Sequence, residues 1–204
     1  MRIKMLISTL VLALLPLGAM AQNSNSRANA PMSSSEMARV MREVHHQLVL
    51  LPWYGVFDNL AYKVDPNGTV TLLGEVRQAT LKKDAENAVK KIEGVEHVEN
   101  QIKILPTSTM DDQIRLRTFH AIYGNGNLSR YAVLAVPTIH IIVENGHVTL
   151  VGVVDSKTDK QIAGVQAKSV PNVFSVTNDL RVEGEEQSSN AEQNGETVAS
   201  KDKK

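Results

Sequence analysis

The 204-residue chain contains no cysteine, which excludes disulfide bonds, thiolate nucleophiles and cysteine-ligated metal centres. Aromatic residues make up only 4% of it, too few for a platform on which single-stranded bases could stack. Its 22 basic residues are balanced by 22 acidic ones, whereas a surface for nucleic acid needs an excess of positive charge. We therefore expect no nucleic-acid partner and no thiol chemistry. The 42% of hydrophobic residues is nevertheless enough for a packed core.

Long apolar runs are also scarce, and the longest lies at the N-terminus. Arg2 and Lys4 precede an apolar run over 5–18, which is short for a membrane-spanning helix. The run leads to a small-x-small ending at Ala21, so we predict a secretory signal peptide over 1–21 rather than an uncleaved anchor. Without a cysteine at the cleavage site a lipoprotein anchor is excluded, and we expect a soluble periplasmic protein.

Two polar segments frame the rest of the chain. Residues 22–35 are rich in Asn, Ser and Ala, and residues 184–204 are rich in Glu, Gln, Ser and Lys. Neither segment has enough apolar surface to fold, so we interpret them as a disordered linker and a disordered tail.

The chain repeats itself once, at an offset of 78 residues. The segment Asn67–Val76 matches Asn145–Val154, and the match continues without a gap to Asn100 and Asn178. Such a repeat predicts two copies of one small unit. We place the two domains at 36–105 and 111–183.

Each copy combines helical and extended patterns. An Asn-Gly pair between extended segments is typical of a β-hairpin, and an amphipathic segment containing Ala85 follows it in the first copy. The fold class is therefore α+β, with two tandem αββαβ modules, each a three-stranded mixed sheet with two helices on one face. The expected strands are 61–64, 69–76 and 95–104, then 139–143, 147–154 and 173–182; the expected first helices are 36–50 and 112–123.

Five glycines carry structural meaning in this pattern. Gly68 and Gly146 belong to the hairpin turns, and Gly94 ends the helix of the first copy. Gly74 and Gly152 interrupt the apolar face of the second strand. A glycine at such a place suggests that another backbone approaches closely, and we expect that of a helix.

The residues offer little support for catalysis. His45 and His46 are adjacent on a predicted helix and point in different directions, so they do not form a chelating pair. His140 and His147 could face each other across a hairpin, although a chance arrangement is the better interpretation. No hydrolase, metalloprotease or phosphate-loop motif is present. We predict that the protein is not an enzyme and uses no metal or cofactor.

Two groups of side chains are candidates for contact with a membrane or a partner. Trp53 and Tyr54 follow the first predicted helix, and such rings favour membrane interfaces; alternatively Trp53 and Phe57 close the end of a thin core. In the second copy, cationic and aromatic side chains could meet lipid phosphates or could simply be solvated. These are Arg115, Arg117, Arg130 and Tyr131.

The pattern resembles the BON domain family. The resemblance is carried by Asn-Gly-x-Val-Thr-Leu-x-Gly-x-Val in both copies, by the alanine-containing helix, and by the endings Gly94-Val95 and Asn172-Val173. Two modules behind a signal peptide look like the osmotically induced periplasmic members of the family. The resemblance implies a non-enzymatic envelope-integrity protein that binds anionic phospholipid surfaces. A holdase-type chaperone for envelope proteins and a structural module that binds a protein or cell-wall partner are the alternatives.

Overall fold

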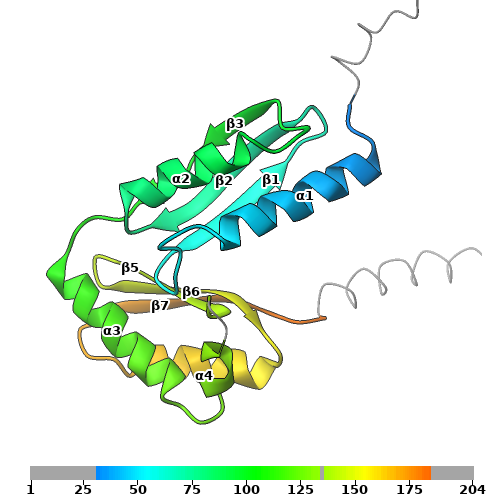
Figure 1. Cartoon of the computed structure of the whole chain (residues 1–204). Helices are drawn as coiled ribbons and strands as arrows, with labels where there is room; N and C mark the ends of the chain where they lie inside the picture. Colours follow the sequence, from blue (N-terminus) through cyan, green and yellow to red (C-terminus); the bar gives the residue numbers. More distant parts are fainter. Residues whose placement is uncertain (1–30, 134–135, 185–204) are drawn as a thin grey trace, which may run out of the picture. The chain divides into compact units, whose positions relative to one another are not determined.

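The computed structural model describes residues 31–133 and 136–184 (Figure 1). The predicted signal peptide, the linker up to residue 30 and the tail beyond residue 184 lie outside the described residues. In chain order the elements are α1 (Ser34–Val49), β1 (Asn59–Val64), β2 (Thr69–Val76), α2 (Ala79–Val89), β3 (His97–Asn100), β4 (Lys103–Ile104), α3 (Thr109–Tyr123), the 3-10 turn η2 (Ser129–Ala132), β5 (Ile139–Glu144), β6 (His147–Val154), α4 (Lys157–Lys168) and β7 (Ser175–Val182).

Two αββαβ modules follow one another, as the repeat predicts. In each module the two hairpin strands are antiparallel and the third strand is parallel to the second: β1-β2-β3 and β5-β6-β7. Figure 1 shows α1 and α2 on one face of the first sheet. The sequence-based fold class is confirmed.

The third strand of the first module differs from the expectation of one strand over 95–104. It is divided into β3 and β4; at the division the Gln101 amide donates to the Leu72 carbonyl, and the Ile102 amide donates to the side chain of Asn100. The Asn100 side chain also donates to the Lys82 carbonyl on α2 at 2.9 Å. Asn100 therefore joins α2 to the sheet. It also accepts from the Ile102 amide, which lies where the hydrogen bonding between β2 and the third strand is interrupted.

The second module repeats this arrangement with an unbroken β7. Asn178 donates to the Lys160 carbonyl on α4 at 2.7 Å and accepts from the Leu180 amide at 3.4 Å. The repeated asparagine thus has the same structural role in both modules.

Each module has its own apolar core. In the first, Val40, Val44 and Leu48 form the buried stripe of α1. In the second, Ile114, Thr118 and Ile122 take the corresponding places on α3. The spacing of three to four residues sets the face that each helix turns toward its sheet. Residues of α1 therefore correspond to those of α3 at an offset of 74.

The hairpins differ by one residue. In the second module, Asn145 (φ 51°) and Gly146 (φ 78°) form a two-residue turn of the type that favours Asn-Gly. The first module has a longer turn. As a result Leu60 stands opposite Gly74 while Ile139 stands opposite Gly152, so β1 and β5 correspond at an offset of 79 (139 minus 60) rather than 78.

The two interior glycines are required by a neighbouring strand, and the expectation of a crossing helix was wrong. Gly74 and Gly152 have φ of +106° and +124°. A Cβ on Gly74 would lie 2.2 Å from the Asn59 carbonyl oxygen, and one on Gly152 would lie 1.9 Å from that of Thr138. Both contacts are far inside van der Waals distance, so only glycine fits.

The connection between α1 and β1 contributes to the second core. Val56 and Phe57 pack against the buried cluster of the second module. The Ile141 amide on β5 donates to the Val56 carbonyl at 2.8 Å, and the ring of Phe57 meets that of Phe119 edge-on at 6.1 Å. Phe57 therefore packs against a core, as one interpretation of the sequence held, and that core is the one of the second module.

Candidate functional site

The turn after α1 exposes the single tryptophan of the chain. Trp53 is 78% exposed and has φ of +70°, a left-handed conformation that bulky side chains rarely adopt. Leu50, at the end of α1, is 63% exposed. The alternative that Trp53 closes a core is therefore wrong, and the turn presents two large apolar side chains to solvent.

Tyr54 turns the other way. Its ring stacks on that of His140 at 5.5 Å, and its hydroxyl lies 3.5 Å from His140 Nε2. Burial raises the pKa of Tyr54 to about 12, and burial likewise lowers the pKa of His140. Tyr54 fixes the base of the turn while the neighbouring Trp53 faces outward.

Arg115 lies inside the second module. It is 3% exposed, and its guanidinium donates to Asp112 at 2.7 Å and to the Val143 carbonyl at 2.5 Å. The bond to Val143 ties α3 to β5 and the bond to Asp112 lies within α3, so Arg115 does not offer its charge to a lipid phosphate. The sequence could not show this, because the inward face of α3 mixes Arg115 and Thr118 with aliphatic residues.

Arg117, by contrast, lies on the exposed face of α3. Two exposed apolar side chains share this helix, Met110 at 52% and Leu116 at 54%. The outer face of α3 therefore combines apolar and cationic groups, as the surface interpretation requires.

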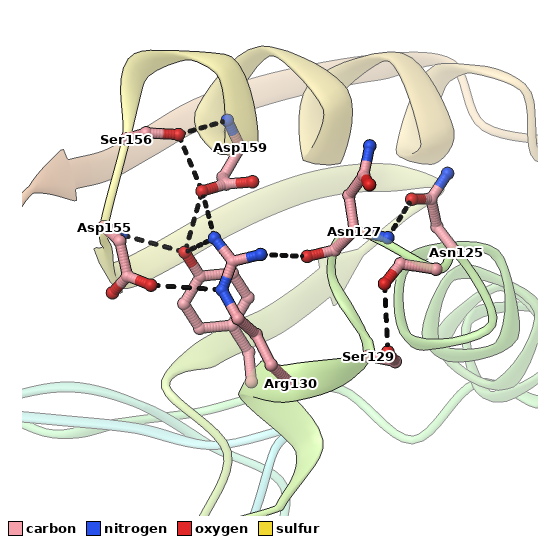
Figure 2. Close-up of polar contacts among 9 residues, drawn as sticks. Asn125, Asn127, Ser129, Arg130, Asp155, Ser156 and Asp159 are labelled. Atoms are coloured by element: carbon pink, nitrogen blue, oxygen red, sulfur yellow. Dashed lines mark hydrogen bonds and ion pairs between the residues drawn. The ribbon is translucent and has the colours of Figure 1, made fainter.

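Arg130 and Tyr131 are held in a polar network at the start of α4 (Figure 2). The Arg130 guanidinium pairs with Asp155 at 3.1 Å and with Asp159 at 2.6 Å. The hydroxyl of Tyr131 donates to Asp159 at 3.0 Å and accepts from the Asp155 amide at 2.8 Å. Ser156 caps α4 by accepting from the Asp159 amide.

The network is electrostatically satisfied. Desolvation alone would raise the pKa of Asp159, but hydrogen bonds from Ser156 and Tyr131 and the charge of Arg130 hold it below its usual value. Burial raises the pKa of Tyr131. Because these donors and acceptors satisfy one another, the network fastens η2 to α4.

The histidine pair suggested for the second hairpin does not form. His140 stands opposite Val151, whereas His147 stands opposite Glu144. Within residues 31–133 and 136–184, no three His, Asp or Glu side chains gather in a way that could hold a metal ion. No helix in these two ranges is both long enough and apolar enough to cross a bilayer.

An open groove of about 920 Å³, which the sequence analysis did not predict, runs along α1 beside β1. Its apolar lining includes Met41, Val49 and Tyr62. The hydroxyl of Tyr62 donates to the Met41 carbonyl at 2.8 Å and joins the strand to the helix. Basic side chains of α1, Arg39 and Arg42, also line the groove.

These features define a class: a tandem α+β protein whose distinctive features are an exposed turn, a mixed helix face and a groove. The sequence profile of the BON domain matches residues 50–106 and 126–184. The chain belongs to the BON domain family. The matched segments begin after α1 and α3, although both helices supply core residues.

Two solved structures of CdsD, a structural protein of the type III secretion system of Chlamydia trachomatis, are also similar. Each is 12% identical with a TM-score of 0.26; one match covers 70% of this chain and 96% of CdsD's C-terminal domain, the other 76% and 97%. No curated protein matches the chain significantly.

Proposed function

We propose that this BON protein is a non-enzymatic envelope protein of the periplasm that binds phospholipid surfaces through the turn after α1. The exposure of Trp53 carries the proposal. An exposed indole in a left-handed conformation stabilises neither the core nor the backbone. At a membrane interface the same ring would bury its apolar face while its N–H stays hydrated.

Neighbouring groups support the same role. Leu50 adds a second apolar side chain to the turn, and Arg42 lies on the exposed part of α1. Contact of this kind would be strongest with anionic headgroups and would weaken as salt screens the charges. Arg117 on α3 is a second cationic candidate. Arg115 and Tyr131 are buried, and Arg130, although half exposed, is paired with Asp155 and Asp159.

Co-sedimentation with vesicles tests the proposal. The chain from residue 22 onward would be mixed with anionic and with neutral vesicles at low and high salt. We expect pelleting with the anionic vesicles at low salt, and a shift of Trp53 fluorescence to shorter wavelength, since it is the only tryptophan. Negligible pelleting with both kinds of vesicle would exclude the function.

A matched pair of variants tests the site. Trp53→Ser should lose most of the binding, whereas Phe174→Ser, which removes an equally exposed ring from the second module, should retain it. Equal binding by the two variants would show that the turn is not the contact.

A further inference from the structure

The groove along α1 has a counterpart in the second module, and the counterpart is filled. By the core correspondence, Met41, His45 and Val49 of α1 match Arg115, Phe119 and Tyr123 of α3. By the strand register, Tyr62 opposite Leu72 matches Ile141 opposite Leu150. The space between the first helix and the edge strand, called here the helix–strand angle, therefore exists in both modules.

In the second module this angle holds Val56 and Phe57, the central residues of a turn in which the Asp58 amide donates to the Gly55 carbonyl at 3.1 Å. The Ile141 amide, at the outer edge of β5, donates to the Val56 carbonyl. The ring of Phe57 meets Phe119, and the ring of Tyr54 stacks on His140. The edge of β5 thus supplies one main-chain bond to the turn, while the helix supplies apolar contacts to its side chains.

In the first module the equivalent positions line the open groove. Met41 is 43% exposed there, and His45 is exposed where Phe119 is partly covered. Tyr62 occupies the register position of Ile141, so its amide is the equivalent edge donor.

We propose that this groove binds a turn segment of a partner protein, whose main-chain carbonyl accepts from the Tyr62 amide at the edge of β1 as the Val56 carbonyl accepts from the Ile141 amide. The segment carries an aliphatic side chain followed by an aromatic one, as Val56 and Phe57 do. An acidic residue beside them would face Arg39 and Arg42. A second copy of the chain is a poorer occupant, because its own Tyr54–Phe57 segment is already docked on its own β5.

A binding experiment with a synthetic peptide tests this. The probe has the sequence of residues 53–58, Trp-Tyr-Gly-Val-Phe-Asp, with a fluorophore at its N-terminus. Its fluorescence anisotropy is measured against the chain from residue 22 onward, without lipid. We expect saturable binding, and binding roughly tenfold or more weaker for a peptide with Asp in place of both Val and Phe.

Protein variants locate the site. Met41→Asp places a charge in the groove, and Val165→Asp places one on the exposed surface of α4. Circular dichroism checks that both are folded. Binding should weaken roughly tenfold for Met41→Asp and stay unchanged for Val165→Asp. Hydrogen exchange should show that the peptide protects the Tyr62 amide in the wild-type chain.

Three results would overturn the proposal: no saturable binding, equal binding of the two peptides, or equal binding by the Met41→Asp variant and the wild-type chain. If the wild-type chain forms a dimer at high concentration and the Met41→Asp variant stays monomeric, the groove would instead be the site of a second copy of the chain. Because the assay contains no lipid, these outcomes are independent of the vesicle experiment.

Discussion

Trp53 combines two unfavourable features at one position. A left-handed backbone costs a residue with a Cβ about 1 kcal/mol or more relative to glycine, and an exposed indole recovers little of this through packing. The turn keeps its shape because Tyr54, the next residue, is anchored on His140. The packing of Tyr54 therefore maintains the left-handed backbone conformation of Trp53.

Replacing Trp53 by glycine should stabilise the free protein. Glycine adopts φ of +70° readily, so we expect Trp53→Gly to raise the free energy of unfolding by about 1 kcal/mol. Urea denaturation measures the change. Trp53→Ala removes the same ring but keeps the Cβ, so it should give no such gain; equal stability of the two variants would show that no strain is present.

Predictions made from the sequence differ from the structure most at the level of single residues. Hairpin glycines are recognisable because Asn-Gly has a local conformational meaning. Trp53, Arg115 and Phe57 were harder to place because each depends on a contact distant in sequence or on the lack of one. The guanidinium of Arg115, for example, is buried and donates to the carbonyl of Val143, a β5 residue 28 positions further along the chain.

At the scale of elements, the polar network around Asp159 sets how α4 begins. Ser156, Arg130 and Tyr131 all bind this carboxylate, and they come from the cap of the helix and from η2. At α2, within the described residues, the cap residue Gln78 accepts only from the Thr80 hydroxyl and makes no side-chain bond to a helix amide. The start of α4 should therefore respond to acid more than that of α2.

The sign of this response follows from the lowered pKa of Asp159. The folded state favours the ionised carboxylate, so its contribution to stability is complete above the unfolded pKa of about 4. That contribution is lost as pH falls through the lower folded pKa. We expect the wild-type chain to lose more stability below about pH 4 than Asp159→Asn, measured by urea denaturation at several pH values. Parallel curves for the two proteins would contradict this.

Element boundaries were largely predictable. β2 and β6 have the expected bounds because a whole apolar face and a hairpin turn define them. The division of β3 from β4 was not predicted, and the side-chain bonds of Asn100 do not explain it, because Asn178 makes the equivalent bonds in the unbroken β7. The groove could not be predicted from the sequence either. The corresponding space in the second module is covered by Val56 and Phe57, and a repeat in the sequence does not show that only one of the two spaces is covered.

At the scale of the whole molecule, His140 joins the turn after α1 to β5. It stacks on Tyr54, and its Nδ1 lies 3.3 Å from the Gly55 carbonyl oxygen. Burial lowers the pKa of His140, and the bond to Gly55 only partly offsets this. The neutral imidazole is therefore the form that the fold favours.

The contact of His140 with Tyr54 and Gly55 should therefore be sensitive to mild acid. The contribution of His140 is complete above the unfolded pKa of about 6.5 and is lost as pH falls through the lower folded pKa. We expect the free energy of unfolding to decrease from pH 7.5 to 5.5 in the wild-type chain and to change less in His140→Phe, which keeps a ring but cannot titrate. Urea denaturation across this range measures the difference, and an identical pH dependence in the two proteins would contradict it.

The docking of Val56 and Phe57 on the second core has a practical consequence for dissecting the molecule. A fragment cut at the start of α3 would carry every strand of the second sheet yet leave a hydrophobic gap where these two side chains belong. Adding residues 54–57 as a separate peptide should then restore what the cut removed. Complementation between fragments, rather than independent folding, is the behaviour to expect when the chain is divided.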